Sequence, residues 1–528
     1  MRNLFLVNLQ IPSILFILLF CGSDALASNL SVSNVAIASR NPSTKKLTAT
    51  FDLTWENAWK TKINHDAVWV TLRLHKAGAN PVAKKLCPLS ASGINPSGTG
   101  TGTSPNIEIY VPTDKAGAFI RLSDYGIQPN VVSQGIQIEI DYEACGFAAD
   151  DSVYLSVFGL EMVYIPKGAF YAGDYGTSTA VLTEGSADAD PWHLMSAGPL
   201  SVSNPTMDGY RYSAVGHAGE DASGSAFSVS AAFPNGYKAF YVMKYELTEG
   251  QWIEFLNSLP SAAARAHHDV TDNNHKNSDA VRARNTVSCS GSPVTCSTQR
   301  PYRAAGYLTW MDLAAFLDWA ALRPMTELEF EKASRGPVVP EEGEFPWGDQ
   351  TITAANTVTT GDEGGSERVL TAGANAHFGS AVISGGDAVY GAEYAYGPLR
   401  QGIFAGSESN RVSSGASYYG VMELSGNVWE RTVTIGNASG RNFAGSHGDG
   451  VLSTASGFEG YANQSDWPGI NPTPARGVDG ADGSGYRGGS FAASQGTLRV
   501  SDRSRAAETN PAASSDSGGR GVRTDDAN

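Results

Sequence analysis

Positive charge, cysteine and long apolar runs are all scarce in this chain of 528 residues. Charged residues make up 17% of the sequence, and the formal net charge is −16. Nucleic acids and anionic membranes both attract basic surfaces, so this balance argues against either as a partner. Beyond the amino-terminal segment no apolar run reaches about 18 residues, the length that spans a bilayer. We therefore do not expect an integral membrane protein.

The amino terminus has the pattern of a secretory signal peptide. Arg2 gives a weakly positive start, the apolar run IPSILFILLF follows, and Ala25–Ala27 offers a cleavage site of small residues before Ser28. We expect residues 1–27 to be removed and the mature chain to be secreted or displayed at a bacterial cell surface. A lipid anchor on Cys21 is the alternative, and the bulky residue before that cysteine argues against it.

Four of the five cysteines follow this segment, and an even number in an exported protein is most simply explained by disulfides. Cys289 and Cys296 enclose only six residues, so a bridge between them would close a short loop. Cys87 and Cys145 would then pair within the amino-terminal region. The alternative, a metal-binding or reactive thiol, finds no support in a CxxC spacing.

The pattern of apolar residues divides the mature chain into two regions. Residues 28–156 contain short segments in which apolar and polar residues alternate, separated by turn-rich stretches, and this pattern predicts a β-sandwich domain. The predicted strands are 46–55, 67–75, 136–142 and 152–159. Residues 157–528 are rich in loops, with helices predicted at 248–259, 309–322 and 323–336 behind the capping residues Thr248, Thr309 and Thr326.

The second region resembles the formylglycine-generating enzyme family, also called the sulfatase-modifying factor domain. The motifs that carry the resemblance occur in order between residues 157 and 524 and include MVYIPKGAFYAGD, YVMKYELTEGQWIEFLNS, YGVMELSGNVWERTV, YRGGSF, LRVSDRSR and GGRGVRT. The resemblance implies an α+β domain with an elaborated C-type-lectin-like fold, few regular elements and calcium-stabilised loops.

The residues that perform the family's reaction are missing from this sequence. The family's enzyme oxidises a cysteine to formylglycine with two copper-binding cysteines that follow the GGSF-type motif, whereas residues 492–500 here read AASQGTLRV. Serine and alanine cannot replace a soft thiolate as a copper ligand. We therefore expect a non-catalytic member that binds no copper.

An iron-dependent branch of the superfamily uses histidines of a helical bundle, which this chain does not contain, so we expect no iron. The densest histidine cluster is His267, His268 and His275 with Asp269. Its polar surroundings favour a solvated loop, and a divalent-metal site is the alternative. No GxSxG motif supports a serine nucleophile.

Calcium is the ion that the resemblance does imply. Its ligands map to Gly426, Val428 and Glu430 in one loop and to Asn356 and Thr357 in another. Calcium accepts carbonyl oxygens, so residue identity matters mainly at the carboxylate. Glu423 stands where the family has an asparagine ligand, and Asp362 is a candidate for the second loop. The alternative is that Glu430 bonds backbone amides or an arginine and no metal binds there.

The last 40 residues predict a recognition surface. A framework with five arginines alternates with segments made almost entirely of small polar residues, which a scaffold can vary without disturbing its core. Trp429 and Tyr486 are expected to belong to the core. The predicted ligand-binding residues are Phe491, Ala492, Ala493, Ser494, Gly496, Thr497, Ser501, Ser504, Thr509, Ser514, Ser515, Asp516 and Ser517.

This arrangement resembles the exported variable proteins of diversity-generating retroelements, which rewrite adenines in codons near the end of a gene. The resemblance implies a non-enzymatic protein whose surface at residues 487–523 binds an unidentified protein or glycan. One alternative is a fixed-ligand or structural protein of the cell envelope. Another is a metal-dependent oxidoreductase of the formylglycine-generating family.

Overall fold

The computed structural model describes most of the chain after the predicted signal peptide. The described residues are 30–78, 83–102, 106–184, 190–203, 209–212, 217–221, 225–272, 275–359, 367–383, 396–406 and 409–526. Residues 1–27 and Cys21 lie outside them. Within these ranges no helix has the length and apolar character needed to cross a membrane.

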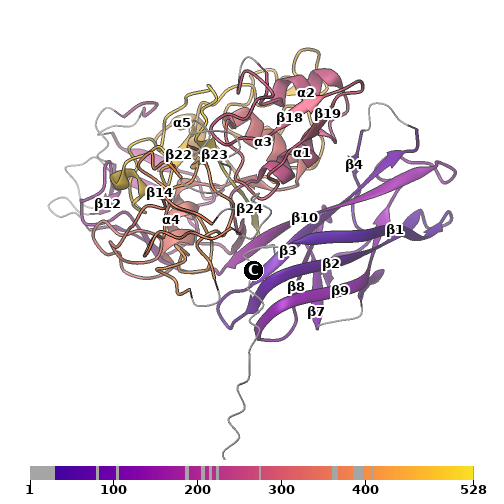
Figure 1. Ribbon diagram of the computed structural model, residues 1–528, viewed down its shortest axis with the longest axis horizontal. Helices are drawn as coiled ribbons and strands as arrows, with labels where there is room; N and C mark the ends of the chain where they lie inside the picture. Colours follow the sequence, from indigo (N-terminus) through magenta and orange to yellow (C-terminus); the bar gives the residue numbers. More distant parts are fainter. Residues whose placement is uncertain are drawn as a thin grey trace, which may run out of the picture.

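The amino-terminal region is a sandwich of two antiparallel sheets (Figure 1). Its first sheet has the order β1-β2-β9-β6 and the strands Ser31–Asn41, Lys46–Lys60, Gly126–Asp141 and Thr99–Thr101. Alternate residues of β2, such as Leu47 and Phe51, are fully buried while their neighbours are partly exposed. This period of two directs one face of each strand into the core, as the sequence predicted.

The second sheet continues from the sandwich into the rest of the molecule, in the order β20-β24-β17-β10-β3-β8-β7-β5 with β4 also paired to β3. Its strands are β3 (Asp66–Lys76), β4 (Lys85–Leu86), β5 (Gly93–Ile94), β7 (Ile107–Val111), β8 (Ala118–Leu122), β10 (Val153–Ile165), β17 (Phe240–Met243), β20 (Arg323–Pro324) and β24 (Gly521–Thr524). The predictions of strands at 46–55, 67–75, 136–142 and 152–159 are confirmed, because these segments lie within β2, β3, β9 and β10, apart from the final residue of 136–142 and the first of 152–159.

Strand β10 belongs to both regions. Residues 153–163 pair with β3 of the sandwich, and residues 162–165 pair with β17 of the following region. The predicted boundary between residues 156 and 157 therefore falls inside one continuous strand. Because the two regions share this strand, backbone hydrogen bonds join them. Figure 1 shows β10 running from the sandwich into the second region.

Both predicted disulfides are present. Cys87 bonds Cys145 within the sandwich. Cys289 bonds Cys296 across the hairpin formed by β18 (Ser288–Ser290) and β19 (Thr295–Ser297). The described cysteines are therefore all oxidised in pairs.

Three short helices in the second region begin directly after the capping residues from which the sequence analysis predicted them. They are α1 (Glu249–Leu256), α3 (Trp310–Trp319) and α4 (Glu327–Arg335), and each begins with a capping box. In α4 the Thr326 side chain accepts from the Glu329 amide, and the Glu329 carboxylate accepts from the Thr326 amide. A helix that the sequence analysis missed, α2 (Ala262–His268), begins behind Ser261.

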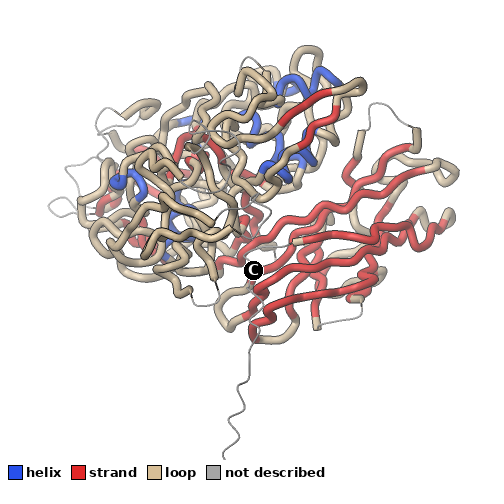
Figure 2. The backbone as a smooth tube through the Cα atoms, in the orientation of Figure 1, coloured by secondary structure: helices blue, strands red, loops and turns tan. Residues whose placement is uncertain are grey.

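The remaining elements are short and loops dominate, so the coarse α+β prediction is confirmed (Figure 2). They are β11 (Phe170–Ala172), β12 (Thr183–Glu184), β13 (Trp192–Leu194), β14 (Leu200–Ser203), β15 (Tyr210–Arg211), β16 (Phe227–Val229), β21 (Trp429–Val433), α5 (Ala438–Arg441), the 3-10 turns η3 (Pro474–Arg476) and η4 (Gln495–Leu498), β22 (Ser484–Arg487) and β23 (Ser517–Gly518).

Trp69 of β3 connects the two regions through its side chain. It is fully buried, packs at a tilt against the ring of Phe119 in the sandwich and donates from its indole nitrogen to the carbonyl of Ala320 at 2.9 Å. The guanidinium of Arg523, near the carboxyl terminus, lies 4.4 Å from the centre of its ring. The core therefore continues from the sandwich into the second region.

Replacing this tryptophan tests the shared core. Trp69→Ala removes a large buried ring and leaves the Ala320 carbonyl unpaired, so the free energy of unfolding should fall by about 3–5 kcal/mol. Tyr154→Ala is the control, because Tyr154 lies on β10 with 60% of its surface exposed and should change stability by less than about 0.5 kcal/mol. Urea unfolding measures both. Equal effects of the two substitutions would contradict a core shared at Trp69.

Candidate functional site

Buried ion pairs connect the predicted recognition segment to helix α4. Arg487 donates to Glu327 at 3.2 Å and to Glu331 at 2.7 Å, and Arg503 donates to Glu327 at 2.6 Å. All four side chains are at most 1% exposed. Burial alone would raise the pKa of Glu327, but Arg503 and Arg487 outweigh it and hold that pKa below its usual range. Glu327 is therefore a charged centre on which the carboxyl-terminal segment is fixed.

Further arginines fix the backbone and side chains of the loops on either side of this centre. Arg335 of α4 donates to the hydroxyl of Ser501 at 2.8 Å, and Arg487 donates to the carbonyl of Val500 at 2.6 Å. Arg431 of β21 donates to the carbonyls of Asn510 and Ala512 at 3.2 and 3.5 Å. Planar guanidinium groups with several donors thus replace regular secondary structure as the support of these loops.

Asp516 joins the two loop segments. Its carboxylate accepts from the hydroxyl of Ser490 at 2.7 Å and from that of Ser514, and its carbonyl accepts from the Trp429 amide at 2.7 Å. On the other side, the Gly379 amide donates to the Ala493 carbonyl at 2.8 Å. The segments around residues 490–493 and 514–516 are therefore connected directly through the Ser490–Asp516 hydrogen bond.

The predicted ligand-binding residues differ in exposure. Ser494, Gly496 and Ser514 are exposed, whereas Phe491, Ser501 and Ser517 are buried. The partly exposed members are Ala492, Ala493, Thr497, Ser504, Thr509, Ser515 and Asp516.

The three buried members belong to the framework. Phe491 packs edge-to-face on Tyr396, Ser501 accepts from Arg335, and Ser517 donates to the Leu308 carbonyl at 2.8 Å. The structure therefore corrects the prediction for these three residues, because their side chains are buried and lie outside the ligand-contacting surface. Sequence reasoning chose them as small or aromatic residues beside variable positions, and only their partners show their burial.

Other exposed residues of the same loops were not among the candidates. They are Gln495, Asn510, Pro511 and Ala512. Trp429 and Tyr486 are 4% and 2% exposed, which confirms that they belong to the core. The half-buried guanidinium of Arg505 stacks on both rings, 4.9 Å from the first and 4.5 Å from the second. Arg431, which donates to the carbonyls of Asn510 and Ala512, also lies 4.4 Å from the centre of the Tyr486 ring.

The histidine cluster is not the solvated loop that the sequence favoured. His268 ends α2 and is fully buried, with its Nδ1 2.8 Å from Asp312 and its Nε2 3.0 Å from the Gly460 carbonyl. His275 contacts Asp312 and Asp272, each at 3.0 Å. Both nitrogens of His275 face carboxylates, an arrangement that suits the charged imidazolium. His268 and His275 therefore contact the same buried carboxylate, that of Asp312.

In the loop around Gly426 and Val428, the structure contains the arginine contact that the sequence analysis gave as the alternative to calcium. The carboxylate that would bind the ion, Glu430, is 1% exposed and accepts from Arg520 at 2.7 Å. Burial raises the pKa of Glu430, and burial likewise raises that of Glu423 to about 7. One oxygen of each of these two carboxylates has no hydrogen-bond partner among the described residues.

The second predicted calcium loop is described only in part. The side-chain oxygen of Asn356 accepts from the hydroxyls of Thr357 and Thr371 at 3.1 and 2.8 Å. Asp362 lies outside the described residues. Within those residues, no group of three or more His, Cys, Asp and Glu side chains is arranged to hold a metal ion. Calcium at Asn356 and Thr357 stays a prediction.

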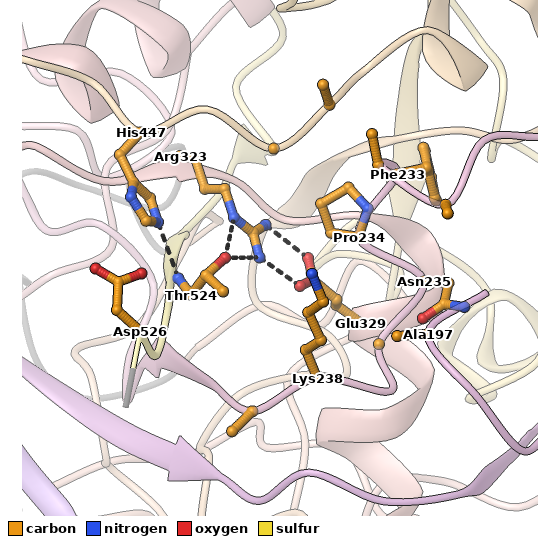
Figure 3. A pocket seen from close by; sticks show the side chains of 16 residues that line it. Ala197, Phe233, Pro234, Asn235, Lys238, Arg323, Glu329, His447, Thr524 and Asp526 are labelled. Carbon is orange, nitrogen blue, oxygen red and sulfur yellow. Dashed lines mark hydrogen bonds and ion pairs between the residues drawn. The ribbon is translucent and has the colours of Figure 1, made fainter. Parts of the chain in front are cut away.

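A small pocket of about 210 Å³ lies away from the predicted surface, and none of the predicted ligand-binding residues lines it (Figure 3). Arg323 donates to both carboxylate oxygens of Glu329 at 2.9 and 2.6 Å. His447 accepts from the Thr524 amide at 3.0 Å, and burial holds its pKa well below the usual value. The buried polar groups are thus bonded to one another, and their role is to join β20, β24 and α4.

The sulfatase-modifying factor enzyme 1-like domain is the family whose model matches this chain, over residues 213–524. The match covers more than half of the sequence, and the chain therefore belongs to this family. The matched range begins at residue 213, whereas the sequence motifs placed the start of the domain at residue 157. Residues 157–212 therefore lie outside the match. No curated protein sequence matches the chain at a significant level.

The histidine cluster predicts a loss of stability at alkaline pH. Burial lowers the pKa of His275, but Asp312 and Asp272 outweigh it and raise that pKa to about 9, above the unfolded value of about 6.5. The stabilisation is therefore complete below about pH 6.5 and disappears as the pH rises through about 9, a change of at most about 3 kcal/mol.

Urea unfolding of the native chain and of His275→Gln between about pH 6 and 9.5 measures this effect. The variant should lose the part of the pH dependence that His275 contributes, while His268 keeps its contacts with Asp312 and Gly460. An identical pH profile for both proteins would show that His275 does not titrate with folding.

Proposed function

We propose that this chain is an exported, non-enzymatic binding protein whose loops within residues 487–523 present a recognition surface to a protein or glycan. We further propose that a retroelement diversifies these loops, as the resemblance implies. The observation that carries the proposal is the division between a framework fixed by buried arginines and exposed small residues with open space around them. The amino-terminal sandwich would hold this surface away from the cell.

Two glycines illustrate this division. A β-carbon built on Gly496 meets no atom within 4 Å, whereas one built on Gly485 of β22 would lie 1.7 Å from the Ala506 carbonyl oxygen. The first glycine is exposed and the second is buried. Gly496 thus has open space for a side chain and Gly485 has none, and a variable surface on a constant scaffold requires positions of both kinds.

The cysteines support a non-enzymatic role. The segment at 487–506 contains no cysteine, and the four cysteines of the mature sequence form the pairs Cys87–Cys145 and Cys289–Cys296. None of them is a free thiolate for copper. Disulfides also favour an oxidising compartment and hence export. Purified protein that retained copper or oxidised a thiol peptide would favour the oxidoreductase alternative instead.

The stability of loop variants tests the proposed surface. Gly496→Tyr should change the free energy of unfolding by less than about 0.5 kcal/mol, because the side chain enters solvent. Gly485→Ala should lower it by about 1–3 kcal/mol or more, because the new methyl group overlaps a backbone carbonyl. Urea unfolding compares the two. A large loss from Gly496→Tyr would mean that the loop is part of the fold and not a tolerant surface.

The DNA around the gene tests diversification. We expect a near-copy of the codons for residues 487–523 that differs only where the copy has adenine, beside a reverse-transcriptase gene. The framework codons for Gly485, Arg503 and Arg520 should match between copy and gene wherever the copy includes them. If sequencing finds no such copy, the loops have a fixed sequence, and the fixed-ligand or structural alternative replaces the diversified binder.

A further inference from the structure

Arg520 is fully buried between two short strands, β23 and β24. Glycines flank it on both sides. A β-carbon on Gly519 would lie 2.5 Å from Leu313, and one on Gly521 would lie 2.3 Å from Leu317, both of helix α3. A side chain at either position would have to displace one of these leucines, so the two glycines allow the backbone around Arg520 to lie close against α3.

The guanidinium of Arg520 is surrounded by oxygen atoms. It donates to the carbonyls of Met243 at 3.0 Å, Lys244 at 3.2 Å, Met422 at 2.9 Å and Glu423 at 3.2 Å. It also donates from Nε to the Glu430 carboxylate at 2.7 Å. A guanidinium has five N–H groups, and these five bonds use all of them. Four carbonyls and one carboxylate form the kind of oxygen set that a hard cation takes.

Three of these oxygens come from the loop where the family resemblance implies calcium, and the carbonyls of Met243 and Lys244 come from the end of β17 and the residue after it. Met422 and Glu423 precede Gly426, and Glu430 is the residue that would supply the carboxylate ligand. Glu246 holds the other side of the loop, because it accepts from the Val428 amide at 3.0 Å and from the Asn427 side chain at 2.5 Å. The loop is thus supported on both sides by side chains of the chain itself.

We propose that Arg520 is the built-in cation of this loop and that its guanidinium neutralises Glu430, the carboxylate that a calcium ion at Gly426, Val428 and Glu430 would need. A second cation a few ångströms from the guanidinium would be repelled by it and would have to compete for the same oxygens. The loop therefore keeps its conformation at any calcium concentration. This inference concerns the scaffold and does not depend on the proposed binding function.

The test measures the melting temperature in EGTA and in about 10 mM calcium, a concentration that saturates weak extracellular sites. Removing the cation with Arg520→Met should lower the melting temperature in EGTA, and calcium should then restore about 3 °C or more by binding the vacated oxygens. The double variant Arg520→Met/Glu430→Gln should lose this gain. Arg503→Met is the matched control, since it removes a buried arginine that bonds Glu327 and should gain no calcium response.

The native loop is tested by Glu430→Gln alone. Any calcium response of the native chain should persist in this variant, because calcium then binds elsewhere, for example near Asn356. A native response that disappears in Glu430→Gln would overturn the proposal, as would a folded Arg520→Met that gains nothing from calcium. If Arg520→Met folds only when calcium is present, the proposal is supported. If it folds in neither condition, the comparison of native chain and Glu430→Gln decides.

Discussion

The ion pairs around Glu327 are the interaction on which the rest of this domain depends. Taking carboxylates and guanidinium groups out of water is costly, so a buried charge persists only with well-placed partners, and removing one partner of such a pair costs about 3–5 kcal/mol. Glu327 meets both Arg487 and Arg503, which lie 160 and 176 residues further along the chain. These contacts fix a long, loop-rich segment to one short helix. That segment contains few strands, so backbone hydrogen bonds between strands would not be enough to hold it.

The same principle explains how irregular loops form a defined surface. Arg431 and Arg335 bond loop carbonyls and hydroxyls, and Asp516 connects Ser490 with Ser514. The backbone is therefore held by residues whose own side chains are buried or nearly so. The exposed residues between them make few of these contacts, and this separation is what the proposed recognition function requires.

Local features of the fold could be predicted from the sequence, and distant contacts could not. Capping boxes, strand alternation and the short Cys289–Cys296 loop depend on neighbouring residues, and each was found where expected. The burial of His268 depends on Asp312, 44 residues away, and a polar sequence around the histidine concealed it. Phe491 and Ser501 were misplaced for the same reason, since only their distant partners remove them from the surface.

The calcium loop shows how a motif can keep its shape while its chemistry changes. Residues 424–430 resemble the family pattern closely enough to imply an ion. Arg520, which bonds Glu430, lies about 90 positions further along the chain. The sequence analysis had assigned its motif, GGRGVRT, only to the framework. A covalently attached cation cannot dissociate, so the loop next to Trp429 does not depend on the surrounding medium. Fixed arginines at Glu430 and at Glu327 therefore serve one purpose, which is to hold loops by charges that belong to the chain.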